Sequence, residues 1–133
     1  MREIQSTEEF SNLLECEMIR ADRAGGVFSI LIVEVENIQT NRHHAQALAY
    51  LLRKRVRVCD FIGWFEENIC LLLTDTHKEG AHILVKSLSK ETIPKEISVN
   101  YQVFTYPSHW FNDSTYKGAL PRDREKTSSQ YNV

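Results

Sequence analysis

The sequence predicts a single α/β domain of the α+β kind, in which helices alternate with the strands of an antiparallel sheet. A chain of 133 residues is long enough for one ordinary core and too short for two. Two apolar runs, residues 61 to 65 and 69 to 73, meet at a short polar turn and are typical of a β-hairpin. Segments with helical spacing and segments with strand composition alternate before and after this hairpin.

The first helix and first strand are predicted from a cap and from an apolar run. Ser6 and Glu9 form a capping-box pattern ahead of apolar residues at helical spacing, so the helix should begin at Ser6. Gly25 and Gly26 should end it. Residues 27 to 35 are apolar on both strand faces, which predicts a central strand that is covered on both sides.

Two further helices are predicted on either side of the hairpin. Residues 41 to 57 place alanine, leucine and valine on one helical face, which indicates a helix that packs on the sheet. After the hairpin, Thr76 with Glu79 offers a second capping box, and Pro94 should mark the end of that helix.

The last strand should span residues 97 to 106, where apolar and polar side chains alternate, and Pro107 should end it. This alternation predicts a strand with one exposed face at a sheet edge. The order is therefore a helix followed by βαββαβ, a ferredoxin-like arrangement with an extra N-terminal helix. Residues 112 to 133 are polar and should form a largely irregular C-terminal tail.

Composition excludes several classes of protein. The net charge of −2 argues against a general nucleic-acid binder, and the basic residues from Arg53 to Arg57 suit the end of a helix. The longest apolar run is too short to span a bilayer, and the first residues lack the apolar stretch of a secretory signal. We therefore expect no membrane partner and a cytoplasmic location.

Cysteines and histidines give no sign of a metal or catalytic site. The cysteines (Cys16, Cys59 and Cys70) are odd in number and widely spaced, and two of them sit in apolar contexts, which favours reduced, buried thiols over disulfides or zinc. The histidines lack ligand spacing and lie in polar stretches, so we expect them at the surface: His43, His44, His77, His82 and His109.

In three places the chain resembles the GGDEF domains that make cyclic di-GMP. Residues 17 to 36 resemble the family's passage from helix to strand, although Glu34 and Glu36 stand where the family usually has Asp-x-Asp. Arg57 and Asp60 are similar to the Arg-x-x-Asp that precedes the signature hairpin of the family. Residues 74 to 76 are similar to the family's exit from that hairpin. Residues 98 to 107 resemble the closing strand. The resemblance implies a nucleotidyl-cyclase-like domain over residues 1 to 111.

The departures from the family imply a degenerate domain. Glu66 and Glu67 stand where the family has glycines that let the backbone approach phosphates, and they add negative charge beside a polyanion. Between Glu36 and Asn41 the chain lacks the segment that recognises guanine in the family. Since phosphoryl transfer depends on positioning, we expect no cyclase activity, and Glu34, Glu36, Glu66 and Glu67 mark vestigial active-site positions.

A metal ion is not expected, although Glu34 and Glu67 fall near the family's two metal-ligand positions. Mg²⁺ usually needs substrate phosphates to complete its shell, and glutamates in a turn are commonly solvated. We therefore expect no cofactor.

Arg57 and Asp60 allow two interpretations. In the family this pair binds the product, and a guanidinium fork with a carboxylate acceptor matches the groups on a guanine edge. Equally, Arg57 would be a cation at a helix end and Asp60 a polar residue before a strand.

Three classes of function follow. The first is a non-catalytic GGDEF-like regulatory module that acts through a protein partner or self-association, and it is the one we favour. Tyr106, Trp110 and Phe111 are then either exposed contact residues or residues that pack the closing strand onto the body. The second is a cyclic di-GMP receptor that uses Arg57 and Asp60. The third, an RNA-binding ferredoxin-like domain, is disfavoured because the central strands lack stacking aromatics.

Overall fold

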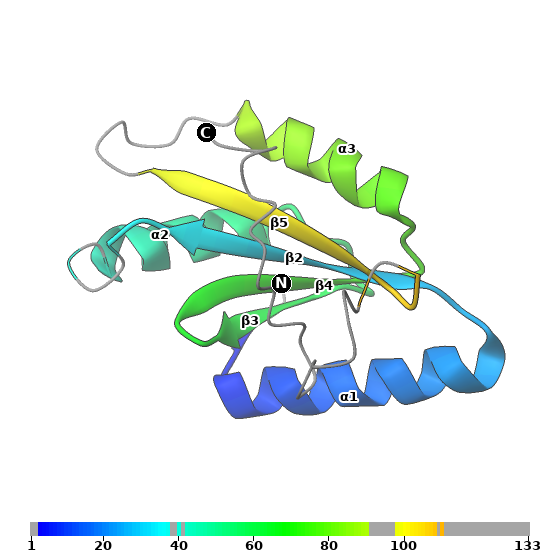
Figure 1. Cartoon of the computed structure of the whole chain (residues 1–133). Helices are drawn as coiled ribbons and strands as arrows, with labels where there is room; N and C mark the ends of the chain where they lie inside the picture. Colours follow the sequence, from blue (N-terminus) through cyan, green and yellow to red (C-terminus); the bar gives the residue numbers. More distant parts are fainter. Residues whose placement is uncertain (1–2, 38–39, 41, 91–97, 109, 111–133) are drawn as a thin grey trace.

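The computed structural model describes residues 3–37, 40, 42–90, 98–108 and 110 (Figure 1). The elements, in chain order, are β1 (Ile4–Gln5), α1 (Thr7–Ala24), β2 (Phe28–Val35), α2 (Arg42–Arg53), β3 (Phe61–Phe65), β4 (Asn68–Thr74), α3 (Lys78–Ser89) and β5 (Val99–Tyr106). They form a five-stranded sheet of order β1-β3-β4-β2-β5. The ferredoxin-like βαββαβ arrangement with an extra N-terminal helix is confirmed.

Strand β1 is absent from the sequence prediction and makes the sheet mixed instead of purely antiparallel. It pairs parallel with β3, Ile4 opposite Ile62 and Gln5 opposite Gly63. All other pairs of strands are antiparallel. Two residues are too few to show the alternation that predicts a strand from sequence. Strand β1 is therefore recognised only by its pairing with the edge of β3.

The sheet is covered on both faces (Figure 1). Helix α1 packs on one face over a buried aromatic and aliphatic cluster that includes Phe10, Leu14 and Phe28. Helices α2 and α3 lie on the other face, over a cluster that includes Leu31 and Leu71. Strand β2 therefore contributes alternate side chains to two cores, which explains its continuous apolar sequence.

Helix α1 begins as its sequence predicts. The hydroxyl of Ser6 accepts a hydrogen bond from the Glu9 amide over 3.1 Å, and the Glu9 carboxylate accepts one from the Ser6 amide over 2.8 Å. At the other end Gly25 adopts a left-handed φ of 73°, the conformation that closes a helix most easily with glycine.

The other two helices differ from their predictions. Helix α2 ends at Arg53 instead of Arg57, because residues 54–60 turn back toward β4. The second capping box does not form. His77, not Thr76, is the N-cap of α3, and it makes no side-chain cap bond. The hydroxyl of Thr76 instead donates to the carbonyl of Thr74 over 2.8 Å.

Strand β5 lies at the sheet edge as predicted, but neither of its faces is open. Gln102 is 4% exposed and Thr105 is 3% exposed, so the prediction of an exposed face is wrong. The hydroxyl of Thr105 lies 2.9 Å from that of Ser29, which satisfies both buried groups.

The aromatic residues near the end of β5 belong to the core. Tyr106 is 7% exposed and Trp110 is 1% exposed. Their rings pack on each other and on Phe28. They therefore pack the closing strand onto the body and do not form an exposed contact surface.

The cysteines are free, but only Cys70 is buried, so the expectation of buried thiols is wrong for Cys16 and Cys59. Several sequence predictions lie outside the described residues, namely those on Asn41, Pro94, Ile97, His109, Phe111 and residues 112–133. None of the helices in the described part of the chain is both long and apolar enough to cross a membrane.

Candidate functional site

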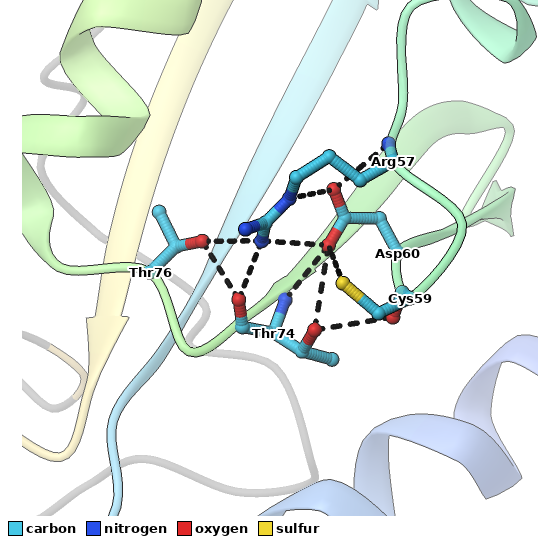
Figure 2. A network of polar contacts seen from close by, with 5 residues as sticks. All are labelled: Arg57, Cys59, Asp60, Thr74 and Thr76. Carbon is cyan, nitrogen blue, oxygen red and sulfur yellow. Dashed lines mark hydrogen bonds and ion pairs between the residues drawn. The ribbon is translucent and has the colours of Figure 1, made fainter.

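Arg57 and Asp60 form a bidentate ion pair in the loop between α2 and β3 (Figure 2). Nε of Arg57 donates to Oδ2 of Asp60 and Nη2 donates to Oδ1, each over 3.0 Å. The backbone amide of Arg57 also donates to Oδ2, over 3.1 Å. The amide of Asp60 returns a bond of 3.0 Å to the carbonyl of Arg57, so residues 57–60 form a closed turn.

The same pair ties this turn to the end of β4. Nη2 of Arg57 donates to the carbonyl of Thr74 over 2.6 Å and to the hydroxyl of Thr76 over 2.9 Å. The backbone amide of Thr74 donates to Oδ1 of Asp60 over 3.1 Å. The Thr74 hydroxyl donates to the carbonyl of Cys59 over 3.1 Å (Figure 2). Sheet pairing brings these partners together across 14 to 19 residues of sequence.

Asp60 has no acceptor capacity left for a ligand. Its residue is 2% exposed, and each carboxylate oxygen accepts two hydrogen bonds of 3.0 to 3.1 Å. A carboxylate offers about four lone-pair sites. A guanine edge could therefore bind Asp60 only by displacing a bond that holds the turn. This geometry matches the structural interpretation of the Arg-x-x-Asp spacing.

Arg57 is partly available, because its side chain is 54% exposed. Its pKa is raised above the ordinary value, chiefly by the hydrogen bond to Asp60, while burial has an opposing effect. Among the five residues drawn in Figure 2, the guanidinium makes its hydrogen bonds through Nε and Nη2, and Nη1 makes none. Arg53 does not join this cation, because its guanidinium stacks on the Tyr50 ring at 4.7 Å. Arg20 pairs with Glu17 on α1 at 3.3 Å.

The four vestigial positions lie at the opposite end of the sheet. Glu34 is a half-buried residue near the end of β2 and Glu36 follows that strand in an exposed turn. Glu66 and Glu67 form the exposed hairpin turn, which lies beside the end of β2 because Val33 pairs with Ile69. The register thus brings the hairpin turn and the end of β2 to the same end of the sheet.

The hairpin turn consists of two residues, since Phe65 pairs with Asn68. Glu66 has a φ of 52° and Glu67 a φ of 68°. Two left-handed residues are the requirement of a type I′ turn, where asparagine and glycine are favoured. The two glutamates fill a tight turn, and their side chains occupy the space that glycines would leave open.

Two hollows flank this end of the sheet. One, of about 380 Å³, is lined by the start of α1, by Arg42 and Ala45 of α2, and by Trp64 and Glu67. The other, of about 480 Å³, is lined by Glu34, Glu36 and the start of β5. Residues 36–41 are the whole connection from β2 to α2. Within the described ranges, no three His, Cys, Asp or Glu side chains are grouped as metal ligands.

Sequence reasoning identified Arg57 and Asp60 but missed their partners Thr74 and Thr76. Hydroxyl residues after a strand are common, and nothing in the spacing shows that they face the loop before β3. The hollow beside Trp64 was also missed, because it joins three elements that are distant in the sequence.

Solved structures share this fold. The GGDEF domain of YfiN from Pseudomonas aeruginosa superposes with a TM-score of 0.65 at 15% identity, over 80% of this chain and 78% of that chain. The GGDEF domain of DgcB from Caulobacter crescentus, solved with c-di-GMP, has a TM-score of 0.61 at 9% identity, over 77% and 70%. The diguanylate cyclase SiaD from Pseudomonas aeruginosa, solved with its activator SiaC, has a TM-score of 0.65 at 15% identity, over 77% and 47%.

The chain therefore has the GGDEF-like fold. No protein-family model matches the sequence, and no curated protein sequence matches it significantly. At sequence identities of 9% to 15%, these structures show that the fold is shared and show no further property of this chain.

Proposed function

We propose that this GGDEF-fold chain is a non-catalytic regulatory module that acts through protein contacts. The observation that carries the proposal is the hairpin turn. It consists of only two residues, and both are glutamates in the left-handed region. Three features of the chain support it, namely the charge of this turn, the length of the connection after β2, and the bonds of Asp60.

The turn is unsuited to a nucleotide triphosphate. Phosphates bind where backbone amides are accessible and the local charge is positive. Here the exposed side chains of Glu66 and Glu67 add two negative charges at the tip. A triphosphate at this position would meet repulsion instead of a cradle of amides.

The connection between β2 and α2 is also too short for a recognition segment. Only residues 36–41 separate the two elements. Within it, the Thr40 amide donates to the Asn37 carbonyl over 3.0 Å. Little chain remains to close over a base, so positioning, the main source of rate in phosphoryl transfer, is reduced.

Regulation through protein contacts is a property reported for one of the similar structures, since SiaD was solved in complex with its activator SiaC. For this chain the same mode of action needs no catalytic group. It requires an exposed surface on a rigid fold, and the two ends of the sheet supply such surfaces.

Incubation of the chain with GTP and Mg²⁺, followed by chromatography of the nucleotides, tests the proposal. We expect no cyclic di-GMP and no linear dinucleotide. Accumulation of either product, reduced in a Glu34→Gln variant, would overturn it. Glu79→Gln, an exposed change on α3, is the control.

A second candidate function is cyclic di-GMP binding at Arg57. DgcB and a further microbial GGDEF domain were solved with this nucleotide, and the exposed side of Arg57 could donate to a phosphate or a guanine edge. The satisfied bonds of Asp60 oppose this function, because the usual carboxylate acceptor is occupied.

Isothermal titration with cyclic di-GMP separates the two functions. Because Arg57→Ala also removes the ion pair, its folding has to be checked by thermal melting before any loss of heat is interpreted. Saturable heat from the parent chain that a folded Arg57→Ala variant lacks, and that Arg20→Ala retains, would make the chain a receptor. We expect no saturable heat.

A further inference from the structure

Strand β5 is one of the two edge strands of the sheet, and among the residues that the structure describes no strand pairs with its outer edge (Figure 1). It pairs with β2 in one unbroken register, from Phe28 opposite Tyr106 to Val35 opposite Val99, so the strand contains no bulge. The other edge strand, β1, is only two residues long. Strand β5 is therefore the long open edge of the sheet.

The sequence of β5 does not protect this edge. Proteins usually block an open edge with charged side chains, with proline or with a bulge. Residues 99–106 read VNYQVFTY and include no charged residue, no proline and no glycine. Valine, tyrosine, phenylalanine and threonine all favour strands. The edge is thus suited to pairing with a further strand.

One hydrogen bond identifies the backbone groups that point outward. The Glu36 amide donates to the Ser98 carbonyl over 2.9 Å, and these two residues continue the register of β2 and β5. Along an antiparallel strand, alternate residues direct both their N–H and C=O groups to the same neighbour. Because Ser98 bonds toward β2, every second residue after it does so too. The residues between them direct both backbone groups to the open edge: Val99, Tyr101, Val103 and Thr105.

Gln102 lies in the middle of this edge strand and has a side chain without a partner. The residue is 4% exposed, and its amide makes no hydrogen bond within the described part of the chain. Burial of an amide without a hydrogen bond is unfavourable. A neighbouring strand that offers one donor and one acceptor at this position would remove that cost.

We propose that the partner of this module is a second copy of the chain, and that the two copies join antiparallel through their β5 edges about a twofold axis at Gln102. This inference names a partner for the proposed function and rests on it. Val99 then lies opposite the partner's Thr105, and Tyr101 lies opposite the partner's Val103. All the outward residues form hydrogen-bonded pairs, each with two N–H···O=C bonds. The two sheets become one continuous sheet.

An identical strand suits this edge better than an arbitrary one. At the axis the Gln102 amide of each copy can donate to the side-chain carbonyl of the other, which satisfies both. Because residues 99–106 are uncharged, no like charges lie opposite one another in the pair. Each copy has a single long open edge, so the contact closes at a dimer.

The charge of α3 predicts how salt affects the pair. This helix packs on β5 and carries exposed Lys78 and Lys86 against exposed Glu79. A twofold axis perpendicular to the sheet places both α3 helices on the same face. Their net positive charges oppose association, so screening by salt should strengthen the dimer instead of dissociating it.

Sedimentation equilibrium from about 10 µM to about 1 mM chain measures the association, a range that suits the small contact of one strand edge. We expect the mean mass to rise with concentration toward that of a dimer and to stop there, at low and at high salt. A chain that stays monomeric over this range, or a mass that continues past the dimer, overturns the inference.

A cross-link tests the position of the axis. Opposite residues in a non-hydrogen-bonded antiparallel pair have Cα atoms about 4.5 Å apart, which a disulfide can bridge. In a background of Cys16→Ser and Cys59→Ser, which removes the exposed thiols, Gln102→Cys should give a disulfide-linked dimer on mild oxidation. Asn100→Cys is the matched control, because its two Cα atoms would lie about 14 Å apart in this register. No cross-link at position 102, or equal cross-linking at both positions, overturns the proposed pairing.

A proline at the edge tests the backbone bonds. Val103→Pro removes an N–H that points away from β2, so each sheet still forms while the contact loses a donor in each copy. We expect association to weaken about tenfold or more, whereas Val103→Ala, which keeps the N–H, should change it less than about threefold. Circular dichroism and thermal melting check that both variants fold. Equal losses in the two overturn the inference, and the cross-link decides if Val103→Pro does not fold.

These measurements use no nucleotide, so they fail separately from the proposed function. A monomeric chain that leaves GTP unchanged overturns the β5 pairing and leaves the lack of catalysis standing. A dimer that makes cyclic di-GMP overturns the lack of catalysis and leaves the pairing standing.

Discussion

Both carboxylate oxygens of Asp60 accept hydrogen bonds from the guanidinium of Arg57, each over 3.0 Å, while Oδ1 also accepts from the backbone of Thr74 over 3.1 Å. The pair that resembles a nucleotide-binding motif thus joins the end of α2 to the end of β4. Its bonds are those of a structural cross-link, and they also close the turn of residues 57–60.

Loss of Asp60 should destabilise the fold more than loss of Arg57. Asp60→Ala leaves the Thr74 amide without its acceptor in a buried place, and we expect a loss of about 2 to 4 kcal/mol in the free energy of unfolding. Arg57→Ala should cost about 1 to 2 kcal/mol, because its side chain is 54% exposed and water replaces part of its bonds.

Urea denaturation measures both losses. Arg23→Ala is the control, since Arg23 is an exposed cation in the last turn of α1 and should contribute about 0 to 0.5 kcal/mol. An Asp60→Ala variant as stable as this control would show that the cross-link does not stabilise the fold.

The hairpin turn should become more stable when glycine is restored. Glu67 has a φ of 68°, so Glu67→Gly relieves a left-handed side chain, and we expect a gain of about 0.5 to 1 kcal/mol. Glu67→Ala removes the same charge but keeps the Cβ atom. Equal gains in the two variants would trace the effect to charge and contradict the backbone explanation.

The hydroxyl of Tyr106 should lose its proton at a higher pH than an ordinary tyrosine does. It donates to the carboxylate of Asp22 over 2.6 Å, and this bond together with burial raises its pKa to about 12. A pKa raised in the folded state contributes stability that is complete below the unfolded value of about 10 and is lost as pH rises through the folded value. Tyr106→Phe should therefore lose less stability than the parent chain between about pH 10 and 12.

Urea denaturation at a series of pH values tests this difference, with Tyr50→Phe as the control for loss of an exposed phenol. If the parent and Tyr106→Phe lose stability in parallel through this window, the bond to Asp22 does not couple the phenol to folding.

The three thiols should react in two classes. Cys16 and Cys59 are exposed, whereas Cys70 is fully buried and burial raises the pKa of its thiol. A thiol reagent should therefore modify two groups at once and the third only as the chain unfolds. Cys70→Ser should abolish the slow phase, and three rapid thiols in the native chain would contradict the burial of Cys70.

Sequence reasoning succeeded where neighbouring residues determine the structure. The capping box of Ser6 and Glu9, the continuous apolar strand β2 and the hairpin around Glu66 all depend on local patterns, and all are present. The Arg57 to Asp60 pair also depends on a spacing of three residues.

Sequence reasoning failed where a distant partner decides. Thr76 has the right spacing to cap α3, but it lies beside the Arg57 guanidinium and bonds the Thr74 carbonyl instead. Strand β1 forms only because the edge of β3 is available to it. For Trp110 the sequence left two roles open, and the choice between them depends on Phe28, 82 positions earlier in the chain, against which Trp110 packs.

The central claim, that a GGDEF-like fold here acts without catalysis, is tested most directly by one measurement. The chain is incubated with GTP and Mg²⁺ at high protein concentration, and the nucleotides are separated over time. The account predicts that GTP remains unchanged, because the turn of Glu66 and Glu67 and the short connection after β2 provide no site for a triphosphate. Formation of cyclic di-GMP, lost in Glu34→Gln and kept in Glu79→Gln, would contradict it.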